Sequence, residues 1–173
     1  MQERPVRYGV RRGWLLAVLL VSACQVGPAA AGPAVMRSAP PPWDAPRDVV
    51  SYVDAAGLER LPLNFRGSSS YLVTLIVKVD GKPVEVPSGV GIDLVRAQQA
   101  PLHTHSTDGT IHIESRTDER PTAGQFFTLW GVRHDATCLG DVCGDVEIRV
   151  NGTAAGWDTA LQPGALVQVS AEH

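Results

Sequence analysis

The clearest pattern in the chain is an alternation of inward and outward positions between residues 71 and 79. The odd-numbered positions carry Tyr, Val, Leu, Val and Val, whereas the even-numbered positions include Thr74 and Lys78. A period of two is typical of a β-strand with one buried face, so we expect the odd side chains to face the core. Asp80-Gly81 follows directly and predicts a tight turn into a second strand over residues 83–86.

A second hairpin is predicted over residues 101–115, because Asp108-Gly109 favours a type I′ turn, which needs positive φ at both central residues. Residues two apart on a strand share a face. One face of this hairpin is therefore apolar and carries Leu102, Thr104, Ile111 and Ile113. The opposite face carries His103, His105, His112 and Glu114.

The loop length decides which of these polar residues are paired. A two-residue loop of Asp108 and Gly109 creates two opposed pairs, which are His105 with His112 and His103 with Glu114. A four-residue loop over residues 106–109 also leaves all four side chains on one face. A three-residue loop with a bulge would separate them.

Two helices are predicted from helical spacing and capping residues. The first spans residues 48–58, and the second spans residues 122–131 between an N-cap at Thr122 and a stop at Gly131. The apolar stripe of the second helix is typical of core packing and consists of Phe126, Phe127 and Trp130.

Two hairpins, one aromatic helix and two further strands, over residues 145–150 and 165–169, make an α+β fold. We expect a small mixed or antiparallel sheet packed on the aromatic helix, in a β-grasp-like arrangement. A small sandwich is the alternative, because it would use the same strands. The apolar face of the histidine hairpin is expected to pack on the helix, which would turn the histidine face outward.

The N-terminal residues have the pattern of an export signal. Four arginines precede an apolar run over residues 14–21, which is too short to span a membrane as a helix but is typical of a signal-peptide core. The run ends in Val-Ser-Ala-Cys24, which resembles a bacterial lipobox, in which the cysteine carries the lipid; an ordinary signal peptide with an incidental Cys24 is the alternative. We predict a lipoprotein signal peptide at 1–23, an Ala/Pro-rich tether at 24–44 and one globular domain at 45–173. The lipid would anchor the protein in the cell membrane, with the domain on the outer side.

Cysteine usage and charge agree with export. Assigning Cys24 to lipid leaves Cys138 and Cys143, which are close enough to form a local disulfide in an oxidising compartment; a thiolate metal pair is the alternative. Removal of residues 1–23 takes away four arginines and one glutamate, which leaves 11 basic and 17 acidic residues and a formal charge of −6. This charge and the lack of a basic stripe argue against nucleic-acid binding.

Several short motifs resemble those of an uncharacterised family of secreted or lipid-anchored bacterial proteins that is common in actinobacteria. The motifs that carry the resemblance are Ala55-Ala-Gly-Leu58, Asp80-Gly-Lys-Pro-Val84, Gly89-Val-Gly-Ile-Asp93, Pro101-Leu-His-Thr-His105, Ile111-His-Ile-Glu-Ser115, Gly124-Gln-Phe-Phe127, Trp130-Gly-Val132, Cys138-Leu-Gly140, Cys143 and Val150-Asn-Gly152. The resemblance implies kinship without an established activity. Similar proteins usually carry a second histidine cluster, and the positions that correspond to it here are Ser70, Leu72 and Thr74.

The polar face of the hairpin predicts a site for a divalent metal ion, with zinc or copper as the candidates. Its ligands would be His103, His105, His112 and Glu114. Imidazole suits Zn, Cu, Ni and Fe, and a carboxylate as the fourth ligand favours Zn or Fe over Cu(I). His134 would add a ligand only if the fold brought it to the hairpin.

Three other interpretations stay open. The histidines can simply bond to backbone or water, or they can belong to a cell-envelope module that docks a protein partner and senses pH. A cupin-like, metal-dependent oxygenase is the third, although cupins place the glutamate closer to the His-x-His pair than Glu114 lies to His105. The sequence contains no nucleophile elbow, Walker loop or metalloprotease helix, so we do not expect an enzyme.

Overall fold

The structure is a computed structural model that describes residues 1, 2, 32–67 and 69–173. Ala31–His173 forms one compact unit. The predicted signal peptide, Cys24 and the first part of the tether lie outside the described residues, apart from the first two residues of the chain. Within the described part, no helix has the length and apolar character needed to cross a membrane.

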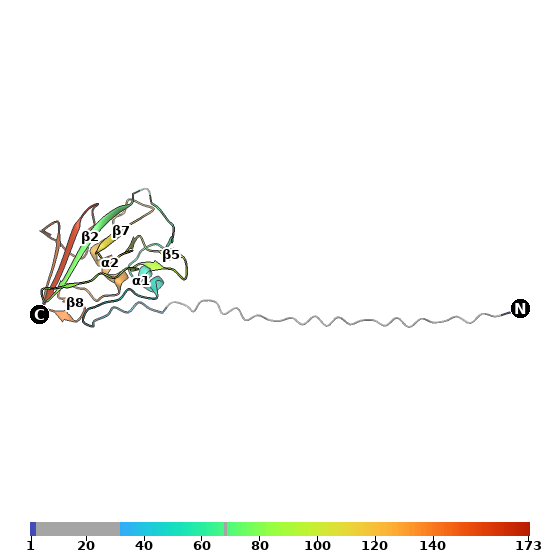
Figure 1. Cartoon of the computed structure of the whole chain (residues 1–173), viewed down its shortest axis with the longest axis horizontal. Coiled ribbons are helices and arrows are strands. Elements are labelled where there is room, and N and C mark those ends of the chain that lie inside the picture. Colours follow the sequence, from blue (N-terminus) through green and yellow to red (C-terminus); the bar gives the residue numbers. More distant parts are fainter. Residues whose placement is uncertain (3–31, 68) are drawn as a thin grey trace. The chain divides into compact units, whose positions relative to one another are not determined.

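The main sheet is mixed, as predicted, and has the strand order β11-β10-β12-β2-β7-β6, with β3 also paired to β2. Its strands are β2 (Tyr71–Val79), β3 (Lys82–Val84), β6 (Leu102–His103), β7 (Thr110–Ile113), β10 (Asp145–Val150), β11 (Thr153–Ala154) and β12 (Leu166–Glu172). The C-terminal β12 runs parallel to β2, and the other pairs are antiparallel. Figure 1 shows β2 next to the red C-terminal strands.

The alternation along β2 separates buried from exposed side chains, as predicted. The inward positions Val73, Leu75, Val77 and Val79 are at most 7% exposed, whereas the even-numbered positions between them are exposed. Helix α2 (Ala123–Trp130) packs on this buried face, where Phe126 and Phe127 meet side chains of β2, β7 and β12. The second predicted helix and its core stripe are therefore confirmed.

The caps predicted for α2 are also present. Thr122 and Gln125 form a capping box, in which the Gln125 amide N–H donates to the Thr122 hydroxyl and the Thr122 N–H donates to the Gln125 side chain. Gly131 ends the helix with φ +68°, and an added Cβ there would lie 2.6 Å from the Tyr52 ring. A glycine is therefore required at this position.

Shorter elements cover the remaining sides of the core. They are α1 (Val49–Ala55), β1 (Leu61–Pro62), β4 (Ile92–Asp93), β5 (Gln98–Gln99), β8 (Cys138–Leu139) and β9 (Val142–Cys143). Helix α1, which was predicted, packs against α2, and β1, β5 and β4 form a separate small sheet. The α+β class is confirmed, and the likeness to a β-grasp arrangement stays a prediction.

Residues 37–43, which we assigned to the tether, pack on the domain. Arg37 exchanges backbone hydrogen bonds with Gly131 and Arg133, at 2.8 and 2.9 Å. Trp43 is 2% exposed, and its carbonyl accepts a hydrogen bond from the Trp130 indole at 2.8 Å. The predicted boundary at residues 44 and 45 therefore lies too late in the chain.

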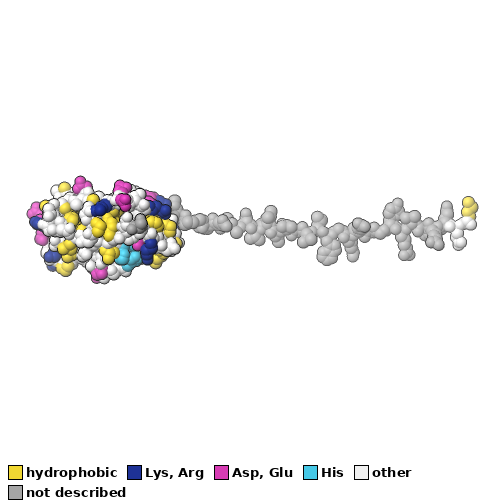
Figure 2. Space-filling view, turned by 90° about the horizontal axis from the view of Figure 1, so that it is seen from above, with side chains coloured by type: hydrophobic (Ala, Val, Ile, Leu, Met, Phe, Trp, Pro, Cys, Tyr) yellow, Lys and Arg dark blue, Asp and Glu magenta, His cyan; other side chains and the backbone are white. Residues whose placement is uncertain are grey.

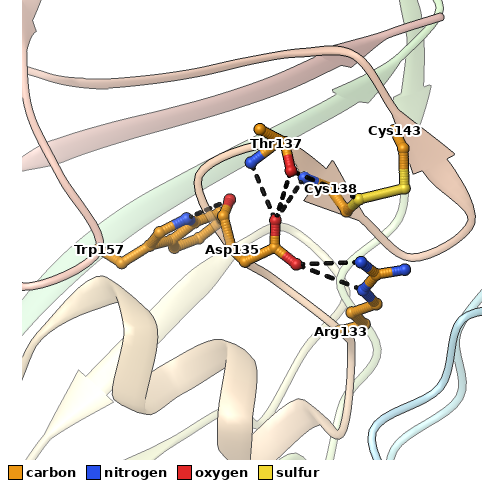
Figure 3. The surroundings of a disulfide bond; sticks show 6 residues. All are labelled: Arg133, Asp135, Thr137, Cys138, Cys143 and Trp157. Carbon is orange, nitrogen blue, oxygen red and sulfur yellow. Dashed lines mark hydrogen bonds and ion pairs between the residues drawn. A yellow bond between two sulfur atoms is a disulfide. The ribbon is translucent and has the colours of Figure 1, made fainter.

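The predicted disulfide joins Cys138 to Cys143 across the small β8–β9 hairpin. Figure 3 shows that Asp135 organises the turn before it: one carboxylate oxygen accepts hydrogen bonds from Thr137 and from the Cys138 N–H, and the other pairs with Arg133. The Trp157 indole donates to the Asp135 carbonyl at 2.8 Å. This network fixes the hairpin on the rest of the domain.

Candidate metal centre

Three of the four predicted ligands come together in space. His103 ends β6, His105 follows two residues later, and His112 lies in the middle of β7. One ligand nitrogen of each ring can be chosen so that all three lie within 4.8 Å of one another. The ring centroids are 4.7 to 5.6 Å apart. This group can hold a metal ion.

The pairing within the hairpin is that of the four-residue loop over residues 106–109, the alternative to the two-residue loop. His103 lies opposite His112, and Leu102 lies opposite Ile113. Only Gly109 of the Asp108-Gly109 pair has positive φ, so the turn is not type I′. The Asp108 carboxylate instead accepts hydrogen bonds from the Ser106 hydroxyl and the Thr110 N–H. These bonds stabilise the longer loop, and the register moves by two residues, which keeps the histidines on one face.

His103 is fully buried, which contradicts the expectation of an outward-facing histidine surface. The cover is a backbone segment that runs beside β6: the Thr104 N–H donates to the Val90 carbonyl and the Thr104 hydroxyl donates to the Pro87 carbonyl. Gly91 makes this approach possible, because an added Cβ would lie 2.3 Å from the Leu102 carbonyl oxygen. The close contact places His103 on the inner side of the cluster.

The two ring nitrogens of His103 have different roles. Nδ1 lies 3.0 Å from the Ala100 carbonyl oxygen, so it carries the proton and donates to that oxygen. Nε2 is buried and has no hydrogen-bond partner among the described residues. Burial lowers the pKa of His103 to about 4. The ring is therefore neutral at pH 7 and has an unshared electron pair on Nε2.

The other two rings lie nearer to solvent. His112 is half-buried and His105 is exposed. Burial, followed by the charge of His105, lowers the pKa of His112. Figure 2 shows histidine side chains gathered in one place on the molecular surface, beside basic and apolar side chains. The cluster is thus closed on the His103 side and open on the other.

Glu114, the fourth predicted ligand, does not belong to the group that can hold the ion. Its buried carboxylate accepts a hydrogen bond from the Gln99 side chain at 2.7 Å and pairs with Arg66 at 3.1 Å. His134 is also separate: its Nδ1 lies 2.9 Å from the Val132 carbonyl oxygen, and its ring packs on Phe127 and Trp157. Sequence reasoning missed Gln99 and Arg66, because Gln99 lies in a two-residue strand and Arg66 lies in a loop, and neither segment carries a periodic signal.

The donor set suits a borderline metal ion. Zn–N bonds of about 2.0–2.1 Å place tetrahedral ligand nitrogens about 3.4 Å apart. The observed separations are at most 4.8 Å, so the nitrogens would have to move closer by at most about 1.4 Å to reach this spacing. Three neutral nitrogens favour Zn or Cu over Mg or Ca, which prefer oxygen ligands. The Ala100 carbonyl orients His103 as outer-shell partners orient metal-binding histidines in known sites.

Comparisons with protein-family models, with characterised proteins and with solved structures find no match for this chain, so the family resemblance of its motifs stays a prediction.

Proposed function

We propose that this chain is an exported, membrane-anchored protein that binds a divalent metal ion, zinc or copper, through His103, His105 and His112. The observation that carries the proposal is the buried Nε2 atom of His103, which has no hydrogen-bond partner among the described residues. An unsatisfied buried polar group costs about 1–3 kcal/mol of stability. Coordination of a metal ion by Nε2 removes this cost, and the two neighbouring imidazoles supply further ligands.

The hydrogen bond to Ala100 adds an independent argument. It fixes the tautomer in which Nε2 is unprotonated, and it orients the ring toward the other two histidines. A buried histidine with a purely structural role commonly satisfies both nitrogens. Here one nitrogen is satisfied by backbone and the other has no partner among the described residues, as expected for a ligand that is prepared before the metal arrives.

The test is a zinc and copper titration of the full chain without a histidine tag. We expect one ion per chain, and we expect His105→Ala to weaken binding by more than the roughly 10- to 100-fold that loss of an outer-shell partner costs. His105 is exposed, so this variant should fold normally. His173→Ala is the matched control, because that exposed histidine pairs with Asp80 outside the cluster. Equal affinity of wild type and His105→Ala would contradict the proposal.

The location of the protein needs a separate experiment. We propose that lipid on Cys24 anchors the chain to the outer side of the cell membrane, which the lipobox-like sequence supports. In cells that export and lipidate the protein, Cys24→Ser should move it from the membrane fraction to the soluble fraction. The Cys138–Cys143 double serine variant, processed in parallel, should stay with the membrane. Membrane retention of Cys24→Ser would contradict the anchor.

A further inference from the structure

The histidine cluster supplies three ligands, whereas zinc and related ions are usually four-coordinate. Within the described residues, the group that can hold an ion contains only His103, His105 and His112. The two carboxylates whose charges reach His112 are engaged elsewhere. Glu114 is held by Gln99 and Arg66, and Asp108 is held within its own loop by Ser106 and Thr110. A fourth ligand must therefore come from outside the group.

The burial of the three rings shows on which side this ligand binds. His103 is 0% exposed and approaches from the interior, His112 is half-buried, and His105 is exposed. An ion bound by all three nitrogens lies near the surface, and its remaining coordination position faces solvent. The open position is accessible to a small molecule.

The charge balance favours an anion at this position. Three neutral imidazoles leave the +2 charge of the ion uncompensated. Glu114 is not a ligand, and its carboxylate forms an ion pair with Arg66 at 3.1 Å, so the pair adds no net charge to the centre. The Arg66 side chain is 73% exposed, and its positive charge acts on the ring of His112. The contact with Glu114 uses Nη1, and a guanidinium has five N–H donors in a planar fork that matches a carboxylate.

We propose that a metal ion at this centre takes a small exogenous carboxylate as its fourth ligand, and that Arg66 binds the second oxygen of that carboxylate. One carboxylate oxygen would coordinate the ion, and the other would accept a hydrogen bond from the guanidinium. This inference rests on the proposed function. It identifies the centre as a binding site for a metal ion together with a carboxylate-bearing small molecule.

The test uses the full chain loaded with Co(II), whose visible absorption reports the ligands of a tetrahedral site. Acetate is titrated in a buffer free of carboxylate and phosphate. We expect acetate to change the Co(II) spectrum of the wild type in a saturable manner. Arg66→Gln should weaken acetate binding by about tenfold, because it removes a charge-assisted hydrogen bond. Arg149→Gln should bind acetate like the wild type, because Arg149 pairs with Glu147 on β10.

Glu114→Gln supplies a second variant with the opposite sign. It removes the charge that balances Arg66, so acetate should bind several-fold more tightly than to the wild type. Normal Co(II) binding without a response to acetate would overturn the inference and leave the metal site intact. Equal acetate affinity of wild type and Arg66→Gln would overturn the role of Arg66. A Co(II) spectrum that varies with protein concentration and ignores acetate would assign the position to a second copy of the chain. Failure to bind Co(II), zinc and copper would overturn both proposals.

Discussion

Replacing Trp43 with alanine tests whether the segment before residue 45 is part of the folded domain. Trp43 is 2% exposed, and its ring meets Trp130 edge-on with the centroids 5.6 Å apart. The segment around Gly140 packs so closely on it that an added Cβ would lie 2.4 Å from the Trp43 ring. An extended tether would show none of these contacts, so a tether and a packed segment predict very different losses of stability.

The expected loss follows from the buried area. A buried tryptophan removes about 150–250 Å² from water, which corresponds to roughly 4–6 kcal/mol at about 25 cal/mol per Å². Large-to-small core substitutions of aromatic residues cost about 3–5 kcal/mol. We therefore expect Trp43→Ala to lower the free energy of unfolding by about 4 kcal/mol.

Urea unfolding followed by far-UV circular dichroism measures this loss without depending on tryptophan fluorescence. Val35→Ala is the control in the same segment, because Val35 is 65% exposed, and it should change the free energy by less than about 0.5 kcal/mol. Trp43→Phe keeps an aromatic ring and should fold even if the alanine variant does not. A loss below about 1 kcal/mol for Trp43→Ala would show that the segment is a tether after all.

Three further predictions concern the centre and the disulfide. The metal-free chain should lose up to about 3 kcal/mol of stability as the pH falls from 6.5 toward 4. Burial lowers the pKa of His103 to about 4, so only the unfolded state takes up the proton in this range. Urea unfolding at pH 7 and 4.5 measures the loss, and His103→Leu should lack this part of the pH dependence. Replacing both Cys138 and Cys143 with serine should cost about 2 kcal/mol, the loop-entropy value for so short a closed loop, and unchanged urea unfolding would contradict this. Leu72 is 51% exposed and lies directly opposite His112, so Leu72→His would place a fourth imidazole beside the cluster. This variant should bind zinc more tightly and should not respond to acetate. A chelator competition that gives the wild-type zinc affinity would refute this prediction.

Local patterns predicted the parts of the fold that depend on neighbouring residues. The alternation in β2 identified its buried face, and Thr122 and Gly131 identified the ends of α2. The spacing of Cys138 and Cys143 identified a disulfide. Each of these features is decided within about ten residues of sequence, so tertiary packing had little opportunity to override it.

The errors arose where distant segments meet. Alanine, proline and glycine before residue 45 indicated a tether, but Trp43 buries its ring against Trp130 and Arg37 bonds to the backbone after α2. The outward orientation predicted for the histidine face was wrong for His103 for a related reason. The hairpin pattern carries no information about the segment around Gly91, which covers His103 through hydrogen bonds to Thr104.

The register of the histidine hairpin shows how a change of loop length can leave a site recognisable and still change its chemistry. The two-residue and four-residue loops differ by two residues in register and leave every side chain on the same side, so three histidines on one face were predicted by either loop. The same shift replaced Glu114 by His112 as the residue opposite His103. It thereby left Glu114 to Gln99 and Arg66, outside the ligand group. A site predicted as three histidines and a carboxylate becomes a group of three histidines, and the carboxylate pairs with Arg66 instead.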